Sequence, residues 1–97
     1  MNNTLREYQE ARKQAFLNNI DNPIKTNDTW YPHVTLIKET SKGYTRYMVT
    51  KYPTGVMMYD VTMYNKQTLD SYRNKQYFYG DIPKTHKAQF EALEQML

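Results

Sequence analysis

Hydrophobic residues follow two different spacings along the chain. Near the N-terminus they recur every three or four residues, as on one face of a helix, at Leu5, Tyr8, Ala15, Phe16 and Ile20. Thr4 and Glu7 fit a capping box, and Pro23 ends the pattern, so we predict a helix over about 4–19. The helical spacing returns near the C-terminus, which predicts a second helix capped by Thr85.

The middle of the chain is typical of strands. Apolar and polar positions alternate over 33–39, 44–52 and 56–64, and the turns between these runs contain Gly43 and Gly55. Such short turns make neighbouring strands antiparallel. We therefore predict one α+β domain over residues 1–97, built from an N-terminal helix, a three-stranded antiparallel β-meander and a C-terminal helix.

Two segments carry no clear hydrophobic period. The first, 21–29, is rich in Asn, Asp, Thr and Pro, so we predict a loop. In the second, 65–84, Asn65 is a candidate cap for a short helix ending at Tyr72 or Asn74, and the alternative is an irregular segment. Residues 76–79 then form a short extended piece or a fourth strand, and 80–83 form a turn. The predicted element order is αβββ(α)α.

Alternation divides the three predicted strands into two faces. We expect one face to form the core beneath the helices, and it consists of Val34, Leu36, Thr45, Tyr47, Val49, Lys51, Met57, Tyr59, Val61 and Met63. The outer face is mixed in character and includes Ile37, Tyr44, Arg46, Met48, Tyr52, Met58, Asp60 and Tyr64.

The composition of the chain excludes several classes of protein. The chain has no cysteine, which excludes disulfides and thiolate chemistry. It has no apolar run near the roughly 20 residues that span a bilayer, and its N-terminus does not resemble a signal peptide. We therefore expect a cytoplasmic protein without a membrane partner. The net charge of +3 is mild for a nucleic-acid binder.

Residue types that carry catalysis are sparse. The two histidines, His33 and His86, lie far apart and lack metal-ligand spacing, so we read His33 as a packed or edge residue and His86 as a neutral surface residue. Ser41 and Ser71 lie in no nucleophile motif. The simplest role for Asp60 is a cross-strand salt bridge to Arg46 or Lys51. We predict no enzymatic activity, no cofactor and no metal.

Tyrosine is the residue type that most clearly indicates binding. Eight of the ten tyrosines lie between residues 44 and 79, together with most of the excess positive charge. Tyr, Met and Arg are enriched in the cores of protein interfaces. The predicted partner-binding residues on the outer face are Tyr44, Arg46, Met48, Tyr52, Met58 and Tyr64, and those in a second patch are Arg73, Lys75 and Tyr77. The alternative is that residues 65–79 fold back and cover the outer face.

Two functions fit this pattern. The first is a small non-enzymatic inhibitor or adaptor that binds a host protein or nucleoprotein, and the predicted element order resembles that of small phage-encoded inhibitors of bacterial defence systems, including anti-CRISPR proteins. The second is a DNA or single-stranded nucleic-acid binder, since a three-stranded sheet followed by a helix is similar to integrase arm-type domains. In that case Tyr44, Tyr52 or Tyr64 would stack on bases while phosphates meet Arg46, Lys51, Lys66, Arg73 and Lys75. The sheet edges also allow a homodimer.

Overall fold

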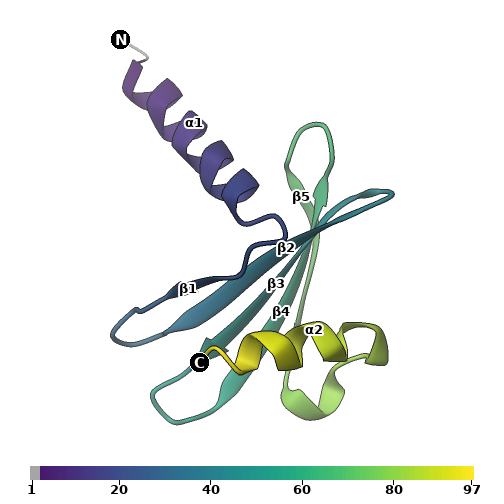
Figure 1. Ribbon diagram of the computed structural model, residues 1–97. Coiled ribbons are helices and arrows are strands. Elements are labelled where there is room, and N and C mark those ends of the chain that lie inside the picture. The colour runs from purple at the N-terminus through teal and green to yellow at the C-terminus, as the bar shows by residue number, and fades with distance from the viewer. Residues whose placement is uncertain (1–2) are drawn as a thin grey trace.

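A computed structural model describes residues 3–97 and shows an α+β fold. Its centre is a five-stranded antiparallel sheet with the strand order β1-β2-β3-β4-β5 (Figure 1). The helices are α1 (Asn3–Asn18) and α2 (Lys84–Glu94), and a 3₁₀ turn, η1 (Tyr79–Asp81), precedes α2. The strands are β1 (Ile24–Thr26), β2 (His33–Thr40), β3 (Gly43–Lys51), β4 (Met57–Asn65) and β5 (Ser71–Tyr77).

The core lies between α2 and one face of the sheet. Phe90 and Leu93 of α2 are buried there, and the Phe90 ring meets Tyr47 and Tyr59 edge to face at centroid distances of 5.4 and 5.2 Å. The strand residues of this core are Val34, Leu36, Tyr47, Val49, Tyr59 and Val61. These core assignments from alternation are confirmed, whereas Met57 and Met63 are only half-buried and Lys51 is exposed.

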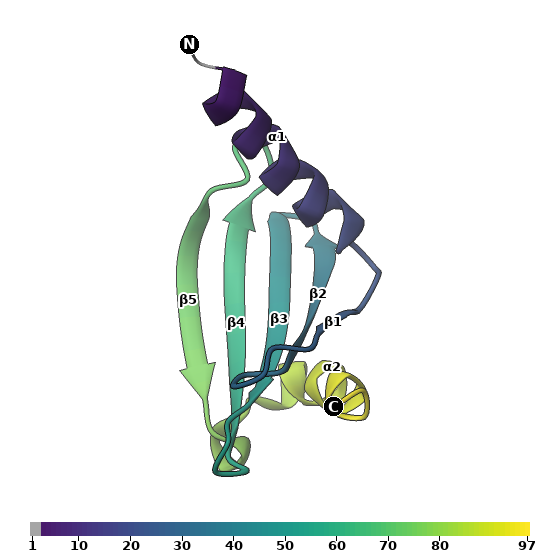
Figure 2. The same ribbon diagram turned by 90° about the vertical axis from the view of Figure 1, so that its left-hand side faces the viewer.

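The predicted position of α1 over the core is wrong. The helix itself is confirmed, but it leaves the sheet at one end and extends away from it (Figures 1 and 2). Leu5 and Tyr8, which the pattern placed in the core, are 59% and 61% exposed. The physical reason is that α2 alone fills the apolar face of the sheet, so no second helix is needed there.

Strand β5 occupies residues 71–77, so the predicted short helix after Asn65 is wrong, whereas the extended piece predicted over 76–79 overlaps the end of β5. The Asn65 side-chain Oδ1 accepts hydrogen bonds from the Gln67 and Thr68 amides at 2.8 and 3.0 Å and closes a tight turn. Asparagine uses the same chemistry to cap helices and to close turns, so its identity does not decide between them. Leu69 completes the turn with φ 62°, and β5 then pairs with β4. The alternative in which 65–79 covers the outer face is therefore excluded.

Three smaller expectations also differ from the structure. The predicted loop 21–29 contains β1, which pairs with β2. Thr4 lies inside α1, which begins at Asn3, and Pro83 precedes α2 without any side-chain capping bond, so neither predicted threonine cap is confirmed. Within residues 3–97, neither helix has the length and hydrophobicity needed to span a lipid bilayer.

Candidate functional site

The outer face is the sheet face opposite α2. It brings together all six strand residues predicted for partner binding: Tyr44 lies opposite Tyr64, Met48 opposite Asp60, and Met58 opposite Thr50, with Arg46 and Tyr52 in the same alternation. All six side chains are half-buried, and α2 lies on the other side of the sheet (Figure 2). The strand part of the predicted site is thus assembled on one continuous surface.

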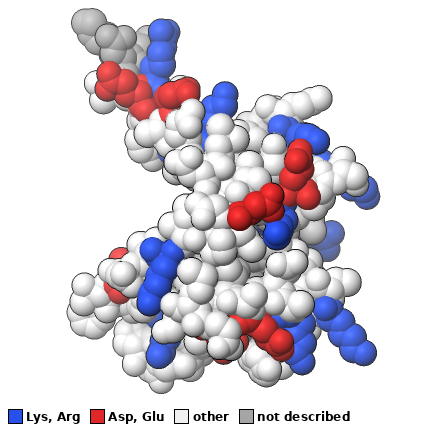
Figure 3. All heavy atoms as spheres, in the orientation of Figure 1, with Lys and Arg blue, Asp and Glu red and all other residues white. Residues whose placement is uncertain are grey.

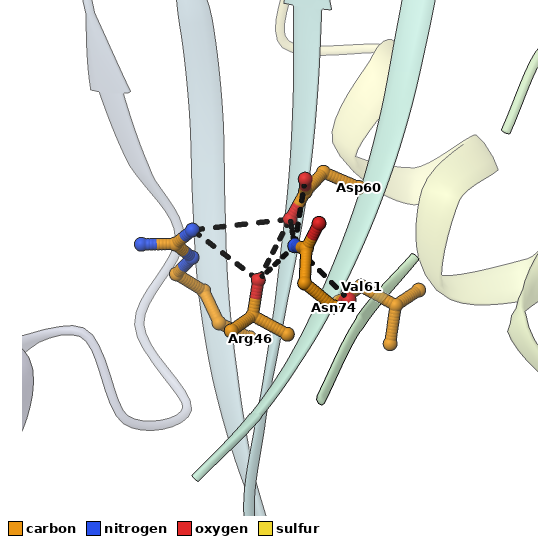
Figure 4. A network of polar contacts seen from close by, with 5 residues as sticks. Arg46, Asp60, Val61 and Asn74 are labelled. Carbon is orange, nitrogen blue, oxygen red and sulfur yellow. Dashed lines mark hydrogen bonds and ion pairs between the residues drawn. The ribbon is translucent and has the colours of Figure 1, made fainter. Parts of the chain in front are cut away.

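A polar network occupies the middle of this face. Asp60 is only 4% exposed, and its Oδ1 accepts hydrogen bonds from the Thr62 hydroxyl at 2.8 Å and from the Asn74 amide at 3.0 Å (Figure 4). Asn74 also donates to the other Asp60 oxygen at 3.0 Å. The Arg46 guanidinium lies 3.8 Å from the same carboxylate. The predicted cross-strand salt bridge from Asp60 to Arg46 is therefore confirmed, and its acid is buried.

Arg46 is the chemically most versatile group on the outer face. Its Nη2 is 3.4 Å from the Thr62 hydroxyl, and the guanidinium carbon lies 5.8 Å from the centre of the Tyr64 ring. The side chain is still 32% exposed, and the buried Nε has no hydrogen-bond partner among the described residues. A guanidinium that is held in place and still partly exposed can recognise a carboxylate or a phosphate.

The last turns of α1 close one end of the outer face. Phe16 packs edge to face against Tyr44 and Tyr64, with ring centroids 5.3 and 5.0 Å apart. Between α1 and the sheet lies a cleft of about 580 Å³, which we call the α1 cleft. Its lining residues are Gln9, Arg12, Lys13, Ala15, Phe16, Asn19, Ile37, Arg46, Tyr64, Thr68, Leu69 and Asp70. Figure 3 shows α1 projecting from the main body of the molecule.

Asn19 fixes the angle at which α1 leaves the sheet. Its side-chain amide donates to the carbonyls of Asn22 and Thr35 at 2.9 and 3.0 Å, and its own carbonyl accepts from the Ile37 amide at 3.0 Å. Ile37 lies opposite Arg46, which confirms its predicted place on the outer face, and this junction buries it. The junction turns at Asp21, which has φ 53°. The C-terminal end of α1 is therefore part of the sheet framework.

Exposed aromatic residues lie at the opposite end of the outer face. Tyr31 meets Tyr52 edge to face at 5.3 Å, and the neighbouring Trp30 is 66% exposed. The Asp28 carboxylate holds this loop by accepting from the amides of Trp30 and Tyr31 at 2.8 and 3.1 Å. These two hydrogen bonds lower the pKa of Asp28, because they favour its charged form.

The remaining predicted site residues lie on the other face. Tyr77 is directly opposite Tyr59, Lys75 opposite Val61 and Arg73 opposite Met63, which puts all three on the α2 side. Tyr77 packs against the core, and all three line a small cavity of about 130 Å³ together with His86. The structure therefore separates this second patch from the outer face.

His86 is half-buried, so its predicted surface position is wrong. Its Nδ1 lies 3.3 Å from the Tyr47 hydroxyl, and burial lowers the pKa of His86 below its ordinary value. Burial also raises the pKa of Tyr47, so the two side chains form a hydrogen bond between neutral groups. This contact stabilises the packing of α2 on the sheet.

Sequence reasoning missed several residues of the site. Arg12, Lys13 and Phe16 were assigned to a core-covering helix, and Asn74 to a short helix. The exposed Trp30 carried a usable signal, because a lone tryptophan in a polar loop has no strand alternation that would bury it. Among residues 3–97, no group of three or more His, Cys, Asp or Glu side chains is placed to hold a metal ion.

Comparisons with known proteins give no match: no family model, no curated protein and no solved structure is similar to this chain. The argument for function therefore depends on the site alone.

Proposed function

We propose that this chain is a non-enzymatic binding protein that docks the outer face onto a partner protein or nucleoprotein, as an inhibitor or adaptor does. The observation that carries the proposal is a sheet face left open by the fold, with Tyr, Met and Arg side chains across it. Aromatic residues and Arg dominate interface energetics. Exposed Trp30 and Tyr31 extend the same surface at one end.

The rigidity of this surface supports the proposal. Tyr44, Arg46 and Met48 belong to the central strand β3, which pairs with β2 on one side and β4 on the other. Side chains on such a framework lose little freedom on binding, which favours affinity. The resemblance in element order to phage-encoded inhibitors does not carry the proposal, because the chain has five strands between its helices rather than three.

The distribution of cations favours a protein partner over nucleic acid. Of the five cations that the sequence suggested for phosphate contacts, only Arg46 occupies an outer-face position within a strand, and it already faces Asp60. Lys66 pairs with Glu39 at 2.9 Å, and Lys51 lies opposite Met57 on the α2 side. Nucleic-acid binding depends on several cations meeting one phosphate backbone.

A pull-down from the cells that express the protein tests this function. The bait is compared with and without nuclease, and with two variants: Tyr52→Ala on the outer face and Arg73→Gln/Lys75→Gln on the opposite face. We expect a protein that survives nuclease treatment, is lost with Tyr52→Ala, and is retained by the double variant. Circular dichroism confirms that each bait is folded.

Two results would contradict the proposal. Loss of all captured material after nuclease treatment would favour the nucleic-acid function. Loss of the partner with the double variant but not with Tyr52→Ala would move the interface to the α2 side.

A further inference from the structure

We infer that the α1 cleft binds an acidic segment of the partner, in which an Asp or Glu side chain stands next to an apolar one. This inference rests on the proposed function and specifies the partner chemistry at one end of the outer face. The acidic side chain pairs with Arg46, Arg12 and Lys13, and the apolar side chain packs against the aromatic lining.

The charge of the cleft is the first argument. Three cations line it, Arg12, Lys13 and Arg46, against a single acid at its rim, Asp70. Among the ion pairs of the described residues, none includes Arg12 or Lys13. The guanidinium carbon of Arg12 instead lies 5.9 Å from the centre of the ring of Tyr8, which is itself exposed. The cleft therefore presents positive charge that the protein itself does not neutralise.

The buried acid beneath the cleft reduces this positive charge but does not cancel it, because it does not pair with Arg12 or Lys13. Asp60 partly offsets the charge of Arg46, but its oxygens already accept hydrogen bonds from Thr62 and Asn74. This arrangement holds the guanidinium in place, and the Arg46 side chain is still 32% exposed. A preformed donor set of this kind is suited to a carboxylate, which accepts two parallel hydrogen bonds from arginine.

The apolar lining is the second argument, and it determines what accompanies the carboxylate. Phe16, Leu69 and the buried Ile37 line the same cleft as the cations. A bare inorganic anion would leave these surfaces in contact with water, whereas a peptide covers them with a neighbouring side chain. The volume of about 580 Å³ is within the range of sites that enclose a small ligand or a short peptide segment.

The aromatic geometry favours a peptide over a nucleic acid. Phe16 and Tyr64 meet edge to face at an interplanar angle of 79°, so the edge of one ring covers part of the face of the other. Single-stranded nucleic acids need aromatic faces that are open for base stacking. Burial raises the pKa of Tyr64, and this supports the view that its ring is enclosed and not presented to a base.

The exposed side of α1 extends the cleft. Leu5 precedes Arg12 by seven residues and Phe16 by eleven, so these side chains lie on one face of the helix. Leu5 is well exposed and therefore continues the apolar lining beyond the sheet. A bound segment can thus run from the outer face along α1.

Selection from a displayed library of random 12-residue peptides, a length of about three helical turns, tests the inference without knowledge of the partner. The full chain is the bait. We expect selected peptides to be enriched in Asp and Glu beside Leu, Phe, Tyr or Trp. One selected peptide is then synthesised, and its affinity is measured by fluorescence anisotropy for the wild type and the variants.

Matched variants separate the cleft from general charge effects. Arg12→Gln/Lys13→Gln removes two positive charges from the cleft, and Arg73→Gln/Lys75→Gln removes two from the opposite face. We expect the first pair to weaken peptide binding by about tenfold or more, the second to change it by less than about twofold, and Arg12→Lys/Lys13→Arg to retain it. Both Gln variants substitute exposed residues, so the fold should be unaffected.

Three results would overturn the inference. The first is that the selected peptides show no enrichment in acidic residues, and the second is that the two Gln variants bind the peptide equally well. The third is that a fluorescent oligothymidylate binds more tightly than the peptide and that Arg12→Gln/Lys13→Gln abolishes this binding. The last result would assign the cleft to phosphate. The pull-down distinguishes failure of this inference from failure of the proposed function. If the pull-down partner is lost with Tyr52→Ala but retained by Arg12→Gln/Lys13→Gln, the proposed function stands and only the cleft assignment is wrong.

Discussion

At the scale of single residues, Asp60 shows how an acid is accommodated inside a sheet. Burying a carboxylate is costly unless hydrogen bonds and a nearby cation replace water. Thr62 is two residues away on β4, Asn74 comes from β5, and Arg46 comes from β3, so three neighbouring strands supply the compensation. The network therefore ties together the strands that carry the outer face.

Asp60→Ala should destabilise the fold by about 1–3 kcal/mol, because it leaves the Asn74 amide and the Arg46 guanidinium without their acceptor. Urea unfolding followed by circular dichroism measures the change. Asp70→Ala is the matched control, since Asp70 is exposed on the turn between β4 and β5 and should cost less than about 0.5 kcal/mol. Equal unfolding midpoints for the two variants would show that the network does not stabilise the sheet.

His86 should make stability depend on pH between about 7.5 and about 5.5. Burial lowers its pKa in the folded protein below the ordinary 6.5, so the unfolded chain takes up a proton at higher pH than the folded one. Stability is therefore full above the unfolded pKa and falls as the pH decreases through 6.5 towards the folded pKa. His86→Gln should show a smaller loss of urea midpoint over this interval. An identical loss in both proteins would assign the pH dependence to other groups.

At the scale of elements, Gly43 connects three strands at the start of β3. It lies opposite both Thr40 on β2 and Asn65 on β4. A Cβ atom at this position would collide with the Tyr64 backbone carbonyl oxygen, which cannot move without breaking the β3–β4 pairing. The close approach of two backbones, and not the turn alone, explains glycine here.

Gly43→Ala should therefore be severely destabilising, by about 3 kcal/mol or more, or prevent folding. Gly80→Ala is the control, because nothing lies within 4 Å of a Cβ atom there. Thermal unfolding of the two variants measures the difference. A Gly43→Ala protein with the melting temperature of Gly80→Ala would mean that β3 and β4 are less closely paired than the structure shows.

Elements were predictable where burial differs between the two faces of a strand. Alternation located β2, β3 and β4 and their core residues, because each has one apolar face under α2. It missed β5, because six of its seven residues are exposed and polar side chains occupy both faces. Asn65 was misread because capping a helix and closing a turn use the same side-chain oxygen.

At the scale of the whole molecule, the site residues that the sequence did not predict are those that join the site only when α1 packs against the sheet. Local alternation placed Tyr44, Arg46 and Tyr64 on one face without any knowledge of the tertiary structure. No local pattern reveals that α1 packs its last turn on that face, because an amphipathic stripe does not specify what it contacts. The α1 cleft is therefore visible only once the elements are assembled.

The projecting part of α1 leads to a prediction about stability within the molecule. Phe16 and Asn19 join the helix to the sheet, whereas residues 4–15 are exposed. A helix of this length is marginal in water without tertiary packing. Its first three turns should therefore open far more readily than the rest of the fold.

Native-state hydrogen exchange should detect this difference. We expect amides of residues 7–13 to exchange on the order of 100-fold or more faster than those of 45–49 in β3. The internal control is α2, which is shorter than α1 but buries Phe90 and Leu93, and should be protected to nearly the same extent as the sheet. Adding the selected acidic peptide should slow exchange in α1 specifically, because the bound segment supplies the missing packing. If the amides of α1 without peptide were protected as well as those of α2, the prediction would be wrong. If the protection of α1 also rose with protein concentration, a second copy of the chain would be the packing partner.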